Sequence, residues 1–322
     1  MSRLQEVLHE TPPTTLLFLV VCALLHILQF AMASPELPSV TFCPRLVIYT
    51  HDYYRIITSA LYHGSFMHIA VNSMSLMAIG SLLEKRMGSL ALSVTILWSI
   101  IVTACLYILA ALAVSYLFQH DALMYQHSVG FSGVLFHLSV LECNLPEHQQ
   151  TPRSVFGVIR VSAKLYPWVL LVALQLFLPN LSFTGHLAGI LAGYLQYYNF
   201  LGCLIPRDRY FREMDGWWLV QSTLRRVPSY VPHSMDHRPN EVSAGAACLL
   251  GVQNARRFFG NLVETVCVIL FGRDAEANAN IQLPSLPGLH ASDNGGNGDK
   301  RDYDDGLDDD DWNGLPSDSE VV

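Results

Sequence analysis

Long apolar runs separated by short polar segments dominate the first 205 residues of the chain. A helix needs about 20 residues to cross the ~30 Å hydrocarbon core of a bilayer. Residues 90–118 are the clearest candidate, because these 29 residues include no charged side chain. Residues 14–34 form a second uncharged stretch of the required length. The pattern predicts four further spans, over residues 66–83, 124–141, 165–183 and 183–205. We therefore expect an all-α membrane domain of six helices over residues 1–205.

The pattern changes after residue 205. Residues 206–248 read as a basic connector that contains several prolines. Residues 249–273 carry an apolar stripe at helical spacing, which predicts an amphipathic helix. That helix could lie on the membrane surface, or it could pack against the membrane domain or a partner. Residues 274–322 are rich in Asn, Gly and Asp, which is typical of a solvated, disordered tail.

The composition supports a membrane protein. Of the 322 residues, 51% are hydrophobic and 14% are charged, whereas a typical soluble domain carries about 25% charged residues. The net charge of -8 is local, because residues 292–322 hold eleven acidic and two basic residues. A nearly neutral apolar body excludes most nucleic-acid-binding proteins. The seven cysteines form no C-x-x-C pair, so we expect neither a metal site nor a disulfide framework, and no cofactor.

The distribution of Lys and Arg over the short loops predicts the orientation. If the N-terminus is cytosolic, nine basic residues fall in cytosolic segments and two, Arg45 and Arg55, fall on the opposite side. The nine are Arg3, Lys85, Arg86, Arg153, Arg160, Lys164, Arg207, Arg209 and Arg212. We therefore expect both termini in the cytosol. The second, fourth and sixth spans then begin on the lumenal or external side.

Four of the polar side chains within the even-numbered spans stand out, because a buried polar group without a partner costs roughly 2–7 kcal/mol. His68 and Asn72 are four residues apart on the second span and share one helical face. Ser132 lies on the fourth span and His186 on the sixth. Alone, such a histidine or serine is more often a packed residue that bonds to its own helix. Together, in the first half of spans that begin on the same side, they predict one site at one depth.

These residue types fit acyl transfer. A serine and a histidine within reach of each other form a nucleophile and its general base. A neighbouring histidine and asparagine supply hydrogen-bond donors for an oxyanion. No Asp or Glu lies at that depth within these spans, so we expect a dyad without a third, orienting carboxylate. A channel or transporter would also place polar groups in a membrane, but it would not explain why they sort into these roles.

Three motifs carry a family resemblance. They are His63-Gly-Ser-Phe-Met-His68-Ile-Ala-Val-Asn72, the box Gly130-Phe-Ser132-Gly133 and the box Gly185-His186-Leu-Ala-Gly189. In order, spacing and helix count the chain resembles the rhomboid intramembrane serine proteases. The resemblance covers residues 54–193, and the outer spans extend it to most of the first 205. One departure is that Tyr54-Arg55 stands where these proteases commonly have a Trp-Arg pair in the first loop, which we expect to keep its role.

The resemblance implies a role for each matched residue. Ser132 would be the nucleophile and His186 the general base and acid. His68 and Asn72 would form the oxyanion hole with the Ser132 backbone N–H. Gly130 would let the chain approach the scissile carbonyl closely.

The remaining glycines of the boxes would serve packing. Gly189 and Gly193 would let the sixth helix press against the fourth at small-xxx-small spacing, which brings His186 to Ser132. Gly133 and Gly185 belong to the same boxes beside the site. Glu84, at the end of the second span, would be a structural cap.

The layout most resembles the six-span endoplasmic-reticulum subgroup with a long cytosolic tail, whose members act on membrane proteins in quality control. The substrates would be transmembrane segments in a lipid bilayer, cleaved near their lumenal side, and the Golgi is the second choice of compartment. The alternative function is a catalytically silent relative that binds and escorts membrane clients. The acidic tail, with Tyr303 and Trp312, suits a cytosolic partner that carries basic residues, or it has no partner.

Overall fold

The computed structural model describes residues 10–32, 36–178, 180–200, 206, 208–227 and 229–233. The predicted amphipathic helix at 249–273, the acidic segment 274–322 and residues 207, 228 and 234–248 of the connector lie outside these residues. The longer helices are α2 (Pro13–Met32), α6 (Phe66–Ser75), α8 (Ser89–Phe118), α10 (Ser132–Cys143), α11 (Tyr166–Phe177) and α12 (Phe183–Tyr197). The shorter helices and turns are α3 (Leu37–Val40), α4 (Pro44–Tyr49), α5 (Arg55–Leu61), η1 (Leu76–Gly80), α7 (Ser81–Met87), α9 (Ala122–Tyr125), η2 (Ala163–Leu165), α13 (Asp208–Asp215), α14 (Trp218–Ser222) and η3 (Leu224–Arg226).

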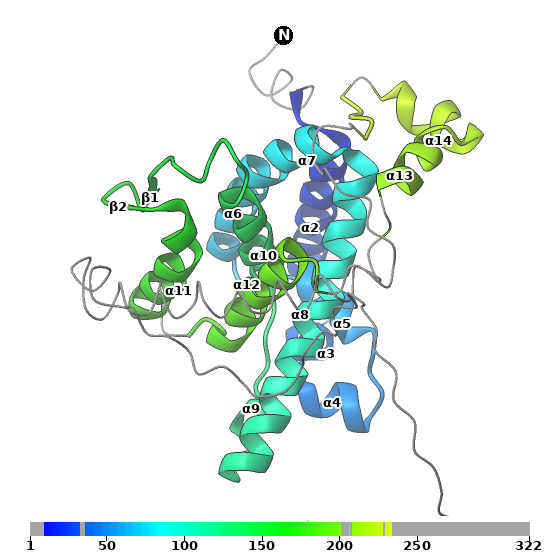
Figure 1. Ribbon diagram of the computed structural model, residues 1–322. Coiled ribbons are helices and arrows are strands. Elements are labelled where there is room, and N and C mark those ends of the chain that lie inside the picture. The colour runs from blue at the N-terminus through cyan, green and yellow to red at the C-terminus, as the bar shows by residue number, and fades with distance from the viewer. Residues whose placement is uncertain are drawn as a thin grey trace, which may run out of the picture. The chain divides into compact units, whose positions relative to one another are not determined.

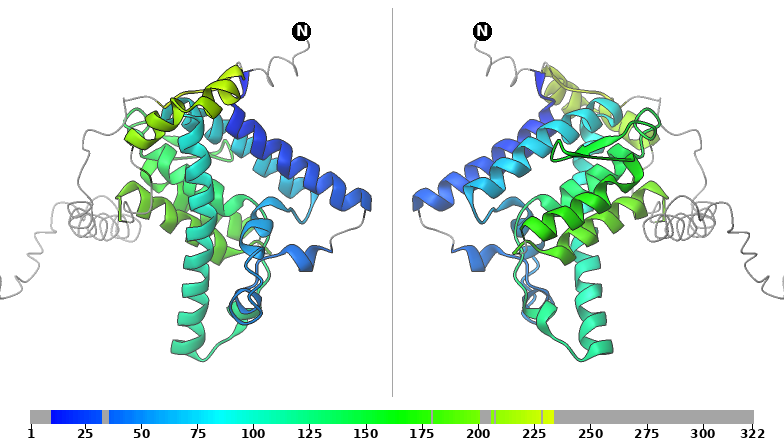
Figure 2. Two further views of the ribbon diagram at one scale, coloured as in Figure 1. Left: turned by 90° about the vertical axis from the view of Figure 1, so that its right-hand side faces the viewer. Right: turned by 90° about the vertical axis from the view of Figure 1, so that its left-hand side faces the viewer.

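Helices α8, α10 and α12 pack against one another at the centre of the bundle (Figures 1 and 2). Each contributes apolar side chains without exposed surface, such as Ile96, Leu138 and Ile190. The close packing of these buried side chains fixes the positions of the three helices relative to one another. Ser132 at the start of α10 and His186 at the start of α12 lie where these helices meet, and residues of α8 line the same pocket.

Helix α2 lies beside η1, and a buried carboxylate fixes the start of α2. Gly80 allows the approach, because a Cβ at this position would lie 3.1 Å from the Thr15 hydroxyl oxygen. Glu84 has no exposed surface and accepts the backbone N–H groups of Thr14 and Thr15 at 2.8 and 2.7 Å. The first N–H groups of a helix have no acceptor within it, and a carboxylate also suits the positive end of the helix dipole. The structural role predicted for Glu84 is confirmed.

The segment between α2 and α6 is a loop of short helices held together by Arg55. Arg55 is 7% exposed, and its guanidinium donates to the Asp52 carboxylate at 2.8 Å. It also donates to the backbone carbonyls of Pro38 and Thr41, both at 2.9 Å. Arg55 therefore joins three turns of the loop, and the neighbouring Tyr54 donates its hydroxyl to the Ser39 carbonyl at 3.2 Å.

The structure contains three helices that are long and apolar enough to cross a membrane, namely Pro13–Met32, Phe66–Met87 and Ser89–Phe118, among the described residues. Helices α10 and α11 each have 12 residues and α12 has 15. Within the predicted fourth span, helix α10 begins at Ser132 rather than at residue 124, and within the predicted fifth span, helix α11 ends at Phe177 rather than at residue 183. Residues 126–131, which lead to α10, are not helical, and Phe131 at the end of this segment is buried.

A small β-hairpin connects α10 to α11. Strand β1 (Arg153–Val155) pairs antiparallel with β2 (Ile159–Val161), with Arg153 opposite Val161. Arg153 forms an ion pair with Glu142 near the end of α10. The all-α prediction therefore holds for the described residues apart from this hairpin.

Candidate active site

Ser132 is the first residue of α10, and an extended segment delivers it there. Phe42 and Ser128 exchange backbone hydrogen bonds of 2.8 and 2.9 Å, which fixes the segment that leads to Gly130. The Gly130 N–H donates to the Ser59 carbonyl at 2.7 Å. Gly130 has φ +118°, a conformation that L side chains rarely adopt. Since the first N–H groups of a helix lack acceptors within it, the Ser132 hydroxyl stands beside available backbone donors.

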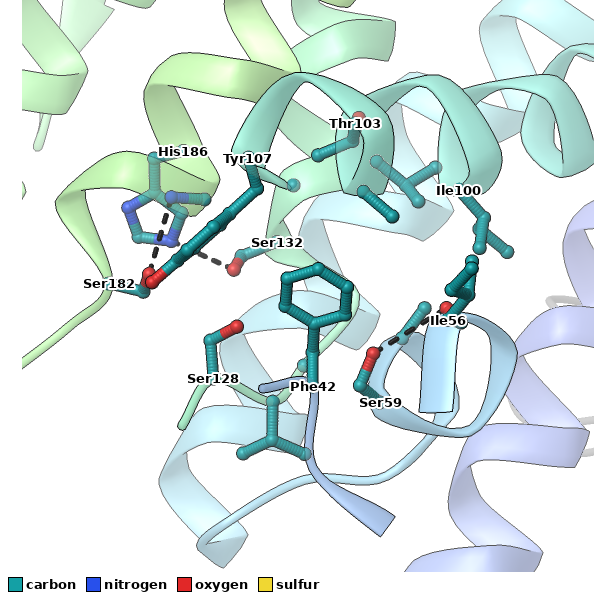
Figure 3. A pocket seen from close by; sticks show the side chains of 17 residues that line it. Phe42, Ile56, Ser59, Ile100, Thr103, Tyr107, Ser128, Ser132, Ser182 and His186 are labelled. Atoms are coloured by element: carbon teal, nitrogen blue, oxygen red, sulfur yellow. Dashed lines mark hydrogen bonds between the residues drawn. The ribbon is translucent and has the colours of Figure 1, made fainter. Parts of the chain in front are cut away.

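His186 reaches Ser132 from the first turn of α12. The Ser182 hydroxyl caps this helix by accepting the Gly185 N–H at 3.2 Å. The His186 Nε2 and Ser132 Oγ atoms are 2.8 Å apart, and Figure 3 shows the two side chains pointing toward one another. The His186 ring is 4% exposed and packs on Phe136, with 4.7 Å between ring centroids. The imidazole is therefore held in position to exchange a proton with the serine.

Glycines on α10 and α12 make this distance possible. A Cβ at Gly189 would lie 2.2 Å from the Gly133 carbonyl oxygen. A Cβ at Gly193 would lie 2.9 Å from the His137 carbonyl oxygen and 2.7 Å from Val140 Cβ. Only glycine fits at these positions without moving one backbone away from the other. Gly189 and Gly193 are therefore the positions at which α12 comes closest to the backbone of α10 in this structure.

His68 and Asn72 lie one turn apart on α6 and border Gly130. A Cβ at Gly130 would lie 2.6 Å from His68 Nε2 and 3.5 Å from Asn72 Nδ2. Asn72 is 6% exposed, and its Nδ2 has no hydrogen-bond partner among the described residues. A buried amide donor ordinarily has an acceptor. The side of Gly130 next to Ser132 therefore offers donors to an incoming oxygen, and Gly130 makes room for them.

A cavity of about 80 Å³ adjoins the serine hydroxyl. Apolar side chains form most of its wall, among them Phe42, Ile100 and Ala104, while the hydroxyls of Thr103 and Ser128 also line it (Figure 3). Thr103 lies 14 residues after the start of α8, about 21 Å along that helix. The cavity therefore lies near the middle of α8 and beside the first turns of α10 and α12.

Sequence analysis missed two residues that surround the dyad. Phe136 packs against the His186 ring. Because Phe136 lies one turn after Ser132 on the same helix, its spacing could have indicated a place beside the dyad. Tyr107 is 2% exposed and donates its hydroxyl to Gln126 Oε1 at 2.9 Å, which joins α8 to the segment before Ser132. Tyr107 stands in an uninterrupted apolar run, so no sequence pattern singled it out. Among the described residues, no group of three or more His, Cys, Asp and Glu side chains could hold a metal ion.

Comparison with known proteins identifies the family. Residues 50–202 match the rhomboid domain. The chain is 34% identical to rhomboid-like protein 15 of Arabidopsis thaliana, over 71% of this chain and 57% of the relative. It is 32% identical to rhomboid-related protein 4 of Homo sapiens, over 58% of this chain and 57% of the relative. It is 27% identical to rhomboid-type serine protease B of Aspergillus fumigatus, over 55% of this chain and 62% of the relative. The matches thus span little more than half the length of these relatives, and through its rhomboid domain the chain belongs to the rhomboid family.

Proposed function

We propose that the protein is an intramembrane serine protease that uses Ser132 and His186 as a catalytic dyad. The observation that carries this proposal is the 2.8 Å separation of His186 Nε2 and Ser132 Oγ. His186 accepts the serine proton at Nε2 while Oγ bonds to the scissile carbonyl carbon. The protonated His186 then gives this proton to the leaving amine. Water then attacks the acyl carbon of the acyl-serine while His186 takes a proton from it, and His186 returns a proton to Ser132 Oγ as the serine leaves.

The negative charge that develops on the carbonyl oxygen is stabilised by the donors around Gly130. These are the Asn72 amide, His68 and the Ser132 backbone N–H. Donors that are already oriented toward the developing charge act strongly in a site that excludes bulk water. The buried Asn72 amide without an acceptor supports this role.

The substrates are transmembrane segments of membrane proteins. The apolar cavity beside Ser132 holds about 80 Å³, which suits a small substrate side chain next to the cleaved bond. A segment cut at this depth must unwind, because a helical peptide bond is not open to attack by a side chain. We infer six membrane spans, with α10, α11 and α12 as the shorter three, and cleavage near the lumenal side. Both termini lie in the cytosol, and the compartment is the endoplasmic reticulum.

The test is cleavage of a panel of transmembrane reporters by the full chain and by Ser132→Ala in the same membranes. The variant removes one oxygen from a polar cavity, so it should fold and lose all cleavage. Labelling of Ser132 by a fluorophosphonate probe checks that the hydroxyl is activated. Equal cleavage by both proteins would contradict the dyad. A protein that captures clients without cleavage or labelling would instead be a silent relative that escorts them.

A further inference from the structure

The segment that follows the membrane domain is docked on the start of α8. We call residues 208–233 the docked module, of which the structure describes 208–227 and 229–233. The Ser89 N–H donates to the Val231 carbonyl at 2.8 Å, and the Val231 N–H donates to the Ser89 hydroxyl at 3.1 Å. His233 Nδ1 donates to the Met87 carbonyl at 2.6 Å. Since Ser89 is the first residue of α8, these bonds place the module at an end of a membrane-length helix.

A buried carboxylate holds the module together. Asp215 is 5% exposed and accepts the His233 N–H at 2.7 Å as well as the Tyr230 hydroxyl. Burial, together with the neighbouring carboxylate, raises the pKa of Tyr230, so its hydroxyl remains a donor. Phe211 is buried and its ring lies 5.4 Å from that of His233. At the docking point, a Cβ on Gly88 would lie 2.8 Å from His233 Cα, so the two backbones are in contact.

The exposed surface of the module displays large apolar side chains. Trp217 is 58% exposed, Trp218 80% and Leu219 61%, whereas the next residue, Val220, is 6% exposed. Figure 1 shows α13 and α14 beside the end of α8 that carries α7, outside the packed helices. Tryptophan is enriched at the level of the lipid headgroups, because its ring is apolar and its N–H is polar. Both the position of α14 beside an end of α8 and the exposed tryptophan side chains fit the membrane interface.

The same stretch is positively charged. Residues 216–227 include Arg225 and Arg226 and no acidic residue. Both arginines are exposed, as is Lys85 at the end of α7. In the proposed topology this is the cytosolic side, where leaflets carry anionic phospholipids that attract basic segments.

We propose that the docked module is an interfacial anchor that inserts Trp217 and Trp218 among lipid headgroups and pairs Arg225 and Arg226 with anionic phospholipid. The alternative partner for this surface of the docked module is the acidic segment Asp274–Val322 of this chain. Its aspartates could meet the arginines, but its large apolar side chains, such as Tyr303 and Trp312, are few and scattered and do not form a surface that would cover two exposed indole rings. The proposal depends on membrane embedding and not on proteolytic activity, so either can fail without the other.

Insertion is tested with the full chain in phosphatidylcholine nanodiscs whose lipids carry bromine atoms. The variant Trp217→Tyr/Trp218→Tyr is measured alongside, and the difference in emission isolates the two indoles. Bromine near the headgroup should quench this difference strongly, and bromine at the bilayer centre should quench it weakly. A difference emission that neither lipid quenches would overturn the proposal.

The charge contribution is tested by hydrogen exchange of the amides of residues 218–227. Exchange should be slower in nanodiscs that contain phosphatidylserine than in neutral ones, by about fivefold for each arginine. Arg225→Gln/Arg226→Gln should remove this difference, while Arg160→Gln, at an exposed position of the β-hairpin, should retain it. A chain truncated after Arg273 should keep the lipid effect. Protection that disappears on truncation and does not depend on phosphatidylserine would assign the surface to the acidic segment and overturn the proposal.

Discussion

Replacing Gly189 with alanine adds one methyl group at the closest contact between α10 and α12. Its Cβ would lie 2.2 Å from the Gly133 carbonyl oxygen and 3.0 Å from the carbonyl carbon. A carbon–oxygen contact is comfortable at about 3.4 Å. Both atoms belong to backbone, so no side chain can rotate out of the way. The two helices must therefore separate by roughly 1 Å, the shortfall from a comfortable contact.

This displacement falls on the dyad. His186 precedes Gly189 by three residues on α12, and Ser132 directly precedes Gly133. The separation of 2.8 Å between Nε2 and Oγ would approach about 4 Å, beyond a hydrogen bond. A misplacement of 1 Å in a catalytic group can cost about 10²-fold in rate. Overpacking should also lower the free energy of unfolding by about 1–3 kcal/mol.

The assay is the rate of fluorophosphonate labelling at Ser132, measured with reporter cleavage and a thermal midpoint on the same detergent preparation. Gly64→Ala is the matched control, because its Cβ would lie 3.7 Å from Leu37 and 3.8 Å from Val129, which are ordinary contacts. We expect Gly64→Ala to label at the wild-type rate and Gly189→Ala to label about 10²-fold more slowly. Wild-type labelling and stability in Gly189→Ala would refute the argument that this contact sets the dyad distance.

Other substitutions separate the remaining roles. His186→Asn should abolish cleavage and weaken fluorophosphonate labelling, because asparagine cannot take the serine proton; equal labelling would assign the base to another group. Asn72→Ala should lower turnover about 10²–10³-fold yet leave client capture by a Ser132→Ala background unchanged, and wild-type turnover would make Asn72 a packing residue. Glu84→Gln should cost about 1.5–3 kcal/mol in detergent unfolding, since an amide cannot accept from both Thr14 and Thr15 as the carboxylate does; an unchanged midpoint would contradict this. Truncation after Arg273 should leave cleavage in detergent unchanged, and an inactive purified product would tie residues 274–322 to catalysis.

Composition and spacing were enough to single out the residues of the candidate site. Ser132, His186, His68 and Asn72 stood out because polar groups in apolar spans need a partner or a purpose. The small residues around them, such as Gly189, predicted a tight helix contact, which the structure contains. The ends of the helices could not be predicted in the same way. Residues 124–131 are as compatible with a helix as those that follow, so the start of α10 at Ser132 could not be read from hydropathy.

Tertiary contacts decided what local pattern left open. The start of α10 follows from the bridge between Phe42 and Ser128 and from the positive φ of Gly130, which are contacts with other segments of the chain. Tyr107 and Phe136 acquired their places beside the dyad because distant helices fold against them.

The sequence by itself determined the membrane-embedded helical class and the set of polar residues, because each depends on the side chain and its immediate neighbours. Only the tertiary structure decided the 2.8 Å dyad separation, because that distance is set by two backbones in contact at Gly133 and Gly189, 56 positions apart in the chain. The docking of Val231 on Ser89 has the same origin, since the hydrogen bonds that fix it join backbone and hydroxyl groups that carry no sequence pattern.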